Sequence, residues 1–374
     1  MAKARLIFDS SSKNADLYYA TGFLVGDPFV YLEASGKKYM VMSDLEIDRA
    51  KKESRGCEVL KSSMYFEKAK GRVSSPGIAE MIDALLRSFR IRKLELHPDT
   101  SFVLVDALRG FGYSITAGKR PFFQERHIKS LEEKKLIAMS QKMTFRAIEM
   151  VRSIIAASKV SAGKLVCGGK VLTSEILRAK VDLFLAERGF IAEDTIIASG
   201  VDACDPHCVG HGPIKAGTSI VVDIFPKSRE TRYFGDATRT FCKGRAPEAL
   251  KKLYATVKKG QELALSMVKA GVVGDVIHSA VSDFFTERGY PTREEKGRMV
   301  GFFHGTGHAV GLEVHEEPAR INKSKYVLAA GNVTSVEPGL YYPSIGGVRI
   351  EDLVYVTEEG FDLLGRYPKQ LEIL

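Results

Sequence analysis

The sequence predicts a mixed α/β fold of two domains, the second of which is internally duplicated. Its 374 residues exceed the size of a usual single core, so two domains are expected. Short apolar runs alternate with helical periodicity before a basic, polar stretch at 121–127. Beyond it, the sequence VDLFLAERGF at 181–190 returns as VSDFFTERGY at 281–290. A repeat of this length indicates two related halves.

The first expected domain spans residues 1–125. Apolar runs at 29–32 and 39–42 have the length and composition of strands, and residues 78–89 have the apolar spacing of a helix. This alternation favours an α/β arrangement for the N-terminal domain.

The second expected domain spans residues 126–374. It opens with a long amphipathic pattern at 131–157 that carries Glu132 and Glu133 in its first turn, as helix starts often do. Strand pairs are expected after the repeated helix of each half. Further helices are expected at about 173–188, 247–269 and 275–288.

Four acidic residues lie at the ends of apolar, strand-like runs, in two pairs. Asp223 lies near the end of one run and Asp236 opens the next, so a turn at 227–232 would fold them together as a hairpin. Glu337 and Glu351 stand in the same relation in the second half. The separations within the pairs are 13 and 14 residues. A pseudo-twofold arrangement of the halves would bring both pairs to one central cleft.

A histidine precedes each pair, His207 in the first half and His308 in the second. Four carboxylates with the His308 imidazole suit two hard divalent ions bridged by oxygen. The surroundings of Asp236 and Glu351 are rich in Val, Ile and Phe, where an unpaired carboxylate would cost several kcal/mol of desolvation. Cations would offset that cost. The ligand set is compatible with manganese, cobalt, iron or zinc and does not separate them.

Composition limits the class of protein. A hydrophobic fraction of 45% with 27% charged residues argues against disorder. The first residues lack the apolar core of a secretory signal, and no stretch approaches the roughly 18 apolar residues of a membrane span, so a cytoplasmic protein without a membrane partner is expected. The net charge of +9 raises a nucleic-acid hypothesis, but acidic residues interrupt the basic run at 49–72 and no nucleic-acid motif accompanies it. A solvated basic face is favoured.

Another metal site could be built from the cysteines. The five cysteines lack C-x-x-C spacing and are odd in number, which argues against a disulfide framework. Two cysteines and two histidines that lie close together in the sequence could form a zinc knot: Cys204, His207, Cys208 and His211. Ligands so close in sequence rarely all reach one tetrahedral ion, so this zinc site is disfavoured.

A zincin helix is a further interpretation, because His304 and His308 have the i, i+4 spacing of its ligands. Gly305 and Gly307 are poor helix residues, and the glutamate that serves as base in such helices is missing. His304 is therefore expected to support the site or the substrate pocket, with a core histidine as the alternative.

Three segments carry a family resemblance: HGTGHAVGLEVHE at 304–316, SVEPGLY at 335–341 and GVRIED at 347–352. They resemble signature segments of the proline-specific M24 metallopeptidases, Xaa-Pro aminopeptidase and Xaa-Pro dipeptidase (prolidase). The resemblance covers about 130–374, and residues 13–50 look like the start of that family's creatinase-type N-terminal domain. It implies a pita-bread catalytic domain, a homodimer and two divalent metal ions, most often manganese, with cobalt or zinc as alternatives.

The resemblance also implies a role for each matched residue. Asp223 would be the bidentate ligand of one ion, Asp236 and Glu351 would bridge, and His308 with Glu337 would bind the other ion, with a hydroxide between the two. Glu337 would also transfer a proton. His207 and His315 would hold the substrate and the developing oxyanion. The residues expected to support the substrate pocket are His304, Tyr341 and Arg349; the alternatives are packing for Tyr341 and pairing with Asp352 or Glu351 for Arg349.

The expected function is hydrolysis of the bond before proline, in dipeptides or longer peptides. Alternatives are a methionine aminopeptidase, a creatinase-like amidinohydrolase, and a non-catalytic pita-bread module that binds nucleic acid or protein. Three residues depart from the family pattern: Phe225 and Ala309 where Gly is frequent, and Ser335 where Thr is frequent. None of them removes a ligand.

Overall fold

The computed structural model describes residues 4–374 of the chain, and they form two compact units. One extends to Arg126 and the other begins at His127. Within the described residues, no helix combines the length and apolar character that crossing a membrane requires.

The N-terminal unit is built on a six-stranded mixed sheet in the order β4-β3-β2-β1-β5-β6. Its first three strands pair antiparallel, whereas β4, β5 and β6 join the sheet in parallel. The strands and helix expected at 29–32, 39–42 and 78–89 are confirmed as β2, β3 and α4. The strands are β1 (Ala4–Asp9), β2 (Phe29–Ala34), β3 (Lys37–Met42), β4 (Glu58–Lys61), β5 (Lys93–Leu96) and β6 (Ser114–Ala117). The helices are α1 (Ala15–Thr21), α2 (Ile47–Glu53), α3 (Ser62–Lys70), α4 (Ile78–Ser88) and α5 (Phe102–Gly110).

The helices of the C-terminal unit confirm the expected periodicity. They are α6 (Leu131–Ala157), α7 (Ser174–Ala186), α8 (Glu248–Met267) and α9 (Gly274–Glu287). A capping box starts α6: the Ser130 hydroxyl accepts from the Glu133 N–H at 3.2 Å, and the Glu133 carboxylate accepts from the Ser130 N–H at 2.8 Å. The repeated decapeptides lie in α7 and α9 and their C-terminal turns.

Two larger sheets form the centre of this unit, in the orders β11-β12-β14-β24 and β18-β17-β19-β22-β23. Their strands are β11 (Ile196–Ser199), β12 (Ile220–Ile224), β14 (Ala237–Lys243), β17 (Gly307–Ala309), β18 (Glu316–Ile321), β19 (Val333–Val336), β22 (Asp352–Val356), β23 (Phe361–Leu363) and β24 (Glu372–Ile373). Smaller sheets contain β7 (Lys159–Ser161), β8 (Lys164–Cys167), β9 (Lys170–Val171), β10 (Phe190–Ile191), β13 (Lys227–Ser228), β15 (Arg293–Glu295), β16 (Arg298–Val300), β20 (Gly339–Tyr342) and β21 (Gly346–Arg349).

The expected strand pairs form in both halves. In the first, β12 pairs antiparallel with β14, so that Asp223 lies opposite Thr238. In the second, β19 pairs antiparallel with β22, so that Val336 lies opposite Asp352. The connections differ: the second one folds as the separate ladder β20–β21 instead of a simple turn.

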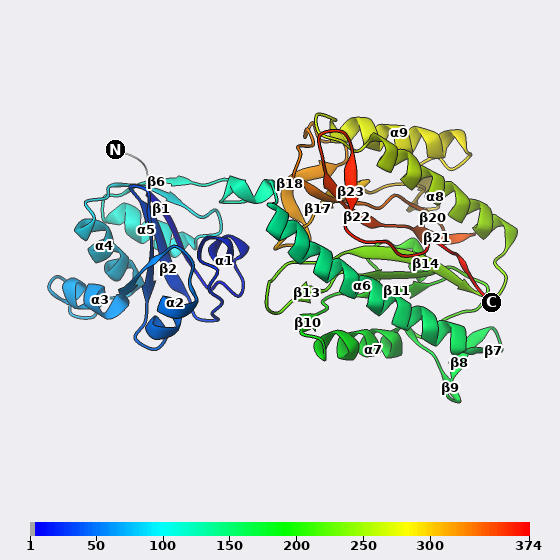
Figure 1. Ribbon diagram of the computed structural model, residues 1–374, viewed down its shortest axis with the longest axis horizontal. Helices are drawn as coiled ribbons and strands as arrows, with labels where there is room; N and C mark the ends of the chain where they lie inside the picture. The colour runs from blue at the N-terminus through cyan, green and yellow to red at the C-terminus, as the bar shows by residue number, and fades with distance from the viewer. Residues whose placement is uncertain (1–3) are drawn as a thin grey trace. The chain divides into compact units, whose positions relative to one another are not determined.

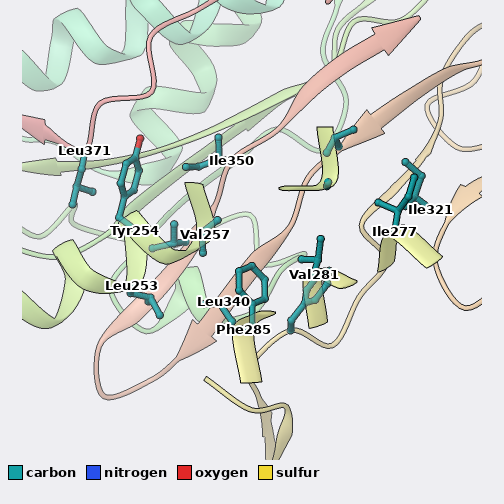
Figure 2. Packing of buried hydrophobic residues seen from close by; sticks show 14 of the residues in the cluster. Leu253, Tyr254, Val257, Ile277, Val281, Phe285, Ile321, Leu340, Ile350 and Leu371 are labelled. Carbon is teal, nitrogen blue, oxygen red and sulfur yellow. The ribbon is translucent and has the colours of Figure 1, made fainter. Parts of the chain in front are cut away.

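Two helices lie against the strands of each half (Figure 1), and buried apolar side chains fill the space between them. Helices α6 and α7 pack with β11, β12 and β14, and helices α8 and α9 pack with β19 to β22. Figure 2 shows Val257 of α8 and Phe285 of α9 in this second core beside Leu340. The close approach of the two helices needs Gly260, since a Cβ there would lie 2.4 Å from the Phe285 ring.

The connection into β14 passes directly beneath α6. A Cβ at Gly235 would lie 2.5 Å from the Ser140 carbonyl carbon and from Thr144 Oγ1. Because helix backbone cannot move aside cheaply, Gly235→Ala is expected to destabilise the protein by about 2–4 kcal/mol. Thermal unfolding tests this, with Gly360→Ala as the matched control, where a Cβ meets nothing within 4 Å. Equal melting temperatures for both variants would contradict the packing described.

Candidate metal centre

The two strand pairs deliver four carboxylates, and β17 delivers His308, to one cavity of about 680 Å³ in the C-terminal unit. One ligand atom from each of Asp236, His308 and Glu351 lies within 4.8 Å of the others. Asp223 and Glu337 line the same cavity. The five side chains singled out in the sequence therefore converge, although they are spread over more than a hundred residues.

Asp223 is held by an arginine. Its Oδ2 accepts a hydrogen bond of 2.7 Å from Arg349 Nη2, whereas its buried Oδ1 has no hydrogen-bond partner among residues 4–374 as the structure describes them. A buried carboxylate oxygen without a donor is costly. Oδ1 therefore has lone pairs free to bind a metal ion. Arg349 pairs here with Asp223 and not with Asp352 or Glu351.

A buried glutamine of α6 fixes the backbone of Asp236. Gln141 Oε1 accepts from the Asp236 N–H at 2.7 Å, and Gln141 Nε2 donates to the Asp236 carbonyl at 2.9 Å. In the second half Gln261 of α8 donates to the Val336 carbonyl at 2.9 Å and to Asp352 Oδ2 at 3.3 Å. Each half thus uses a glutamine of its long helix to hold the strand ends that carry its acidic residues.

Thr238 links the two halves at Glu351. Its hydroxyl donates to Glu351 Oε2 at 2.8 Å, and its carbonyl accepts from the Glu351 N–H at 3.0 Å. Arg349 Nε in turn donates to the same hydroxyl at 3.2 Å. Glu351, only 1% exposed, is therefore oriented by a residue of the opposite strand pair.

His308 and Glu337 form an ion pair, with His308 Nε2 3.2 Å from Glu337 Oε1. Burial opposes the charge on both groups. Their mutual hydrogen bond and attraction outweigh it, lowering the pKa of Glu337 to about 2 and raising the pKa of His308 to about 9. Ser335 orients both, because its hydroxyl accepts from the His308 N–H at 3.0 Å and donates to Glu337 Oε1 at 3.2 Å. Ser335, which stands where the family frequently has Thr, therefore still supplies the hydroxyl that makes these hydrogen bonds.

The remaining carboxylates repel one another. Burial, followed by the charge of Asp223, raises the pKa of Asp236 well above its ordinary value. Burial and the charge of Asp236 do the same for Glu351. Among the described residues, His308 and Arg349 form the ion pairs found with this group, so four carboxylates share two cationic partners. Divalent ions would relieve the repulsion, and the oxygen-rich donor set with one imidazole fits them.

A hydrogen-bonded chain leads from the acidic cluster to His304. The Tyr341 hydroxyl accepts from Arg349 Nη1 at 2.9 Å and lies 2.8 Å from His304 Nε2. His304 Nδ1 lies 2.7 Å from the Gly305 carbonyl, so Nδ1 carries the proton and Nε2 accepts from the tyrosine. Burial raises the pKa of Tyr341 to about 12 and lowers the pKa of His304 to about 4. His304 is therefore neutral at pH 7.

The other two predicted histidines line the wall of the cavity. His207 and His315 are exposed, and the His315 ring lies 4.3 Å from the His308 ring, centre to centre. Although the side chain is exposed to the cavity, partial desolvation of its ring, followed by the charge of His308, lowers the pKa of His315 to about 4. Phe225, one of the departures from the family pattern, also lines this wall.

Several supporting residues were missed in the sequence. Gln141 and Gln261 lie within apolar stripes of long helices, and a polar residue at such a position is the signal that could have found them. Thr238 gave no signal, because a threonine is ordinary in a strand.

The four residues of the zinc knot, which the sequence analysis disfavoured, do not come together. Cys204 is buried, with its Sγ 3.9 Å from the Gly200 carbonyl, and His207 lines the cavity. Asp202 takes their place beside Cys208 and His211. The zincin interpretation is wrong, because His308 lies in strand β17 and not in a helix.

The model of metallopeptidase family M24 matches residues 134–358. This chain belongs to metallopeptidase family M24. It is 30% identical over 371 residues to the Xaa-Pro dipeptidase of Pyrococcus horikoshii, covering 96% of this chain and 93% of that protein. The structure resembles X-Pro aminopeptidase from Thermotoga maritima with a TM-score of 0.81 and 25% identity, over 99% of this chain and 97% of that one. It also resembles Xaa-Pro dipeptidase from Bacillus anthracis, with a TM-score of 0.81 and 26% identity, over 99% of this chain and 94% of that one.

These similarities confirm the expected fold of an N-terminal α/β domain followed by a pita-bread catalytic domain, and the recognition of the family. Membership of a metallopeptidase family implies divalent metal ions, in agreement with the acidic cluster. Since these similar proteins include both dipeptidases and an aminopeptidase, the similarity does not separate the two activities.

Removing one negative charge tests the crowding of the carboxylates. Because the folded state raises the pKa of Glu351, it binds the proton more tightly than the unfolded chain, and the metal-free protein loses stability as pH rises above the ordinary value of 4.5. Glu351→Gln is therefore expected to stabilise the metal-free protein by about 1–3 kcal/mol at pH 7.5, with little effect at pH 4.

Denaturant unfolding after chelation measures this difference. The exposed Glu359→Gln is the matched control and is expected to unfold like the parent protein. A metal-free Glu351→Gln protein that is less stable than the parent at pH 7.5 would contradict the repulsion described.

Proposed function

We propose that this protein is a metal-dependent exopeptidase that hydrolyses the peptide bond before proline, with two divalent ions held by Asp223, Asp236, His308, Glu337 and Glu351. The observation that carries the proposal is the convergence of these five side chains on one cavity in a chain of family M24. Relatives named Xaa-Pro dipeptidase and X-Pro aminopeptidase support the substrate class.

The chemistry divides between the ions and the side chains. When bound, the two ions would polarise the scissile carbonyl and lower the pKa of the attacking water. Glu337 lies beside the cluster with Oε1 hydrogen-bonded to Ser335 and close to His308, so its carboxylate is held where it can accept a proton and return it to the leaving amine.

The histidines on the cavity wall would bind the substrate. His207 and His315 are exposed to the cavity, and a neutral imidazole can donate a hydrogen bond to a developing oxyanion. The chain through Arg349 and Tyr341 fixes the tautomer of His304, so that its ring keeps one orientation toward the substrate.

The finer parts of the proposal rest on the family resemblance. We assign manganese as the preferred metal and a homodimer as the assembly, and the cytoplasm remains the predicted location. The oxygen-rich ligand set supports manganese over metals that favour thiolates.

Peptide hydrolysis by the manganese-loaded protein tests the function. Xaa-Pro dipeptides and Xaa-Pro-Yaa tripeptides are assayed in parallel, with a Met-Ala-Yaa peptide for the methionine aminopeptidase alternative. Cleavage before proline is expected. Hydrolysis of dipeptides alone identifies a dipeptidase, and hydrolysis of tripeptides alone identifies an aminopeptidase. Cleavage of the Met-Ala-Yaa peptide alone, or of none, would overturn the proposal and favour the alternative enzyme or the non-catalytic module.

The role of Glu337 has its own control. Glu337→Gln is expected to lower kcat by about 100-fold to 10,000-fold, because the amide cannot accept the proton. Glu359→Gln, an exposed glutamate on the same unit, is expected to leave kcat unchanged. Exhaustive chelation is expected to abolish turnover, and manganese to restore it. Undiminished hydrolysis after chelation would exclude metal catalysis.

A further inference from the structure

A second group of metal-binding side chains lies on the loop after β11. Asp202, Cys208 and His211 each offer one ligand atom, and these atoms lie within 4.8 Å of one another. Cys208 Sγ is 3.8 Å from His211 Nδ1, and the same ring nitrogen is 3.8 Å from Asp202 Oδ2. The cluster contains none of the five residues of the acidic centre.

We propose that Asp202, Cys208 and His211 form a separate binding site for one zinc-like divalent cation, which stiffens the loop that carries His207.

The separations of the ligand atoms fit a tetrahedral ion. Bonds of roughly 2.3 Å to sulfur and 2.0–2.2 Å to nitrogen and oxygen give ligand separations of about 3.4–3.6 Å at tetrahedral angles. The observed value of 3.8 Å for each of the two measured pairs exceeds this by a few tenths of an ångström. Small rotations of exposed side chains are sufficient to close the difference, since His211 is 70% exposed.

The ligand chemistry selects a different metal from that of the acidic centre. A thiolate, an imidazole and one carboxylate suit zinc, cobalt or other borderline metals, whereas four carboxylates with one imidazole accept harder ions. Three protein ligands leave the fourth position to water. On binding, the Cys208 thiol loses its proton to the buffer and its sulfur bonds to the cation.

The carboxylate of Asp202 also favours a cation. In the part of the chain that the structure describes, the His211 ring is the ion-pair partner found for Asp202, at 3.8 Å. Asp202 Oδ2 also accepts from the His211 N–H at 3.1 Å, which brings the two ends of the loop together without neutralising the carboxylate. This hydrogen bond between the Asp202 side chain and the His211 backbone thus closes the loop before any ion binds.

The position of the cluster connects it to the cavity. The loop is anchored at both ends. At one end Ala203 lies against β21, where a Cβ at Gly347 would lie 1.7 Å from the Ala203 carbonyl oxygen. At the other end Arg178 Nη1 donates to the Val209 and Gly210 carbonyls at 2.5 and 2.7 Å. Between these anchors, Asp205 and His207 are exposed.

An ion held by residues 202, 208 and 211 would therefore restrain the exposed middle of the loop. That segment includes Pro206 and His207, which line the cavity. The Pro206 carbonyl accepts from Arg349 Nη2 at 3.3 Å, and the same nitrogen donates to Asp223 at 2.7 Å. A cation at the loop thus acts on the wall of the acidic centre, and it reaches the ligand Asp223 through Arg349.

Cobalt titration gives a direct readout. The full-length protein is first loaded with manganese, then titrated with Co²⁺ while near-ultraviolet absorbance is recorded. The acidic centre contains no sulfur ligand, so a sulfur-to-cobalt charge-transfer band reports the proposed site alone. The band is expected to saturate at one equivalent, and it does not depend on whether the protein hydrolyses Xaa-Pro peptides.

Matched variants assign the band. Cys208→Ser and His211→Gln are expected to lose it, whereas Cys167→Ser, at another partly exposed cysteine of the same unit, is expected to keep it in full. In hydrogen exchange, Zn²⁺ is expected to slow the amides of residues 205 and 207–209 in the manganese-loaded parent and not in Cys208→Ser. Circular dichroism and the melting temperature show that each variant is folded.

Three outcomes would overturn the proposal: the parent shows no charge-transfer band; folded Cys208→Ser keeps the band; or Cys167→Ser loses it. If the band appears as expected but zinc leaves exchange at 205 and 207–209 unchanged, the site binds a metal without restraining the loop, and the proposed stiffening is wrong.

Discussion

The C-terminal unit depends on neutralising the carboxylates that its two halves bring together. Asp236 and Glu351 are 3% and 1% exposed, and both are adjacent to further acidic groups. His308 and Arg349 balance part of the charge. Burying this much negative charge lowers the stability of the fold. The arrangement is therefore best understood as a binding site for cations.

Duplication explains how a chain can build such a site. Each half supplies a long helix, a repeated helix and an antiparallel strand pair, and each long helix contributes one buried glutamine, Gln141 or Gln261, to the strand ends. Cross-links between the halves then set the positions of the acidic groups, as Thr238 does for Glu351. The same helix α6 also passes close to Gly235, next to Asp236.

The sequence predicted the parts of this arrangement that depend on local pattern. Apolar periodicity placed the helices, the strand pairs and the repeat, and carboxylates at strand ends indicated a metal centre. Contacts between residues far apart in the sequence could not be predicted from local pattern. Gln141 lies 95 residues before its partner Asp236. Arg349 pairs with Asp223, 126 residues away, instead of with its sequence neighbours. The ladder β20–β21 and the place of Asp202 in the Cys208 cluster also depend on tertiary packing.

Anomalous diffraction from crystals loaded with manganese tests the central claim most directly. Two anomalous peaks are expected about 3.5–4 Å apart, among the side chains of Asp223, Asp236, His308, Glu337 and Glu351. If fully loaded crystals gave no peak in this cavity, or placed manganese away from these five side chains, the buried negative charge would need another explanation.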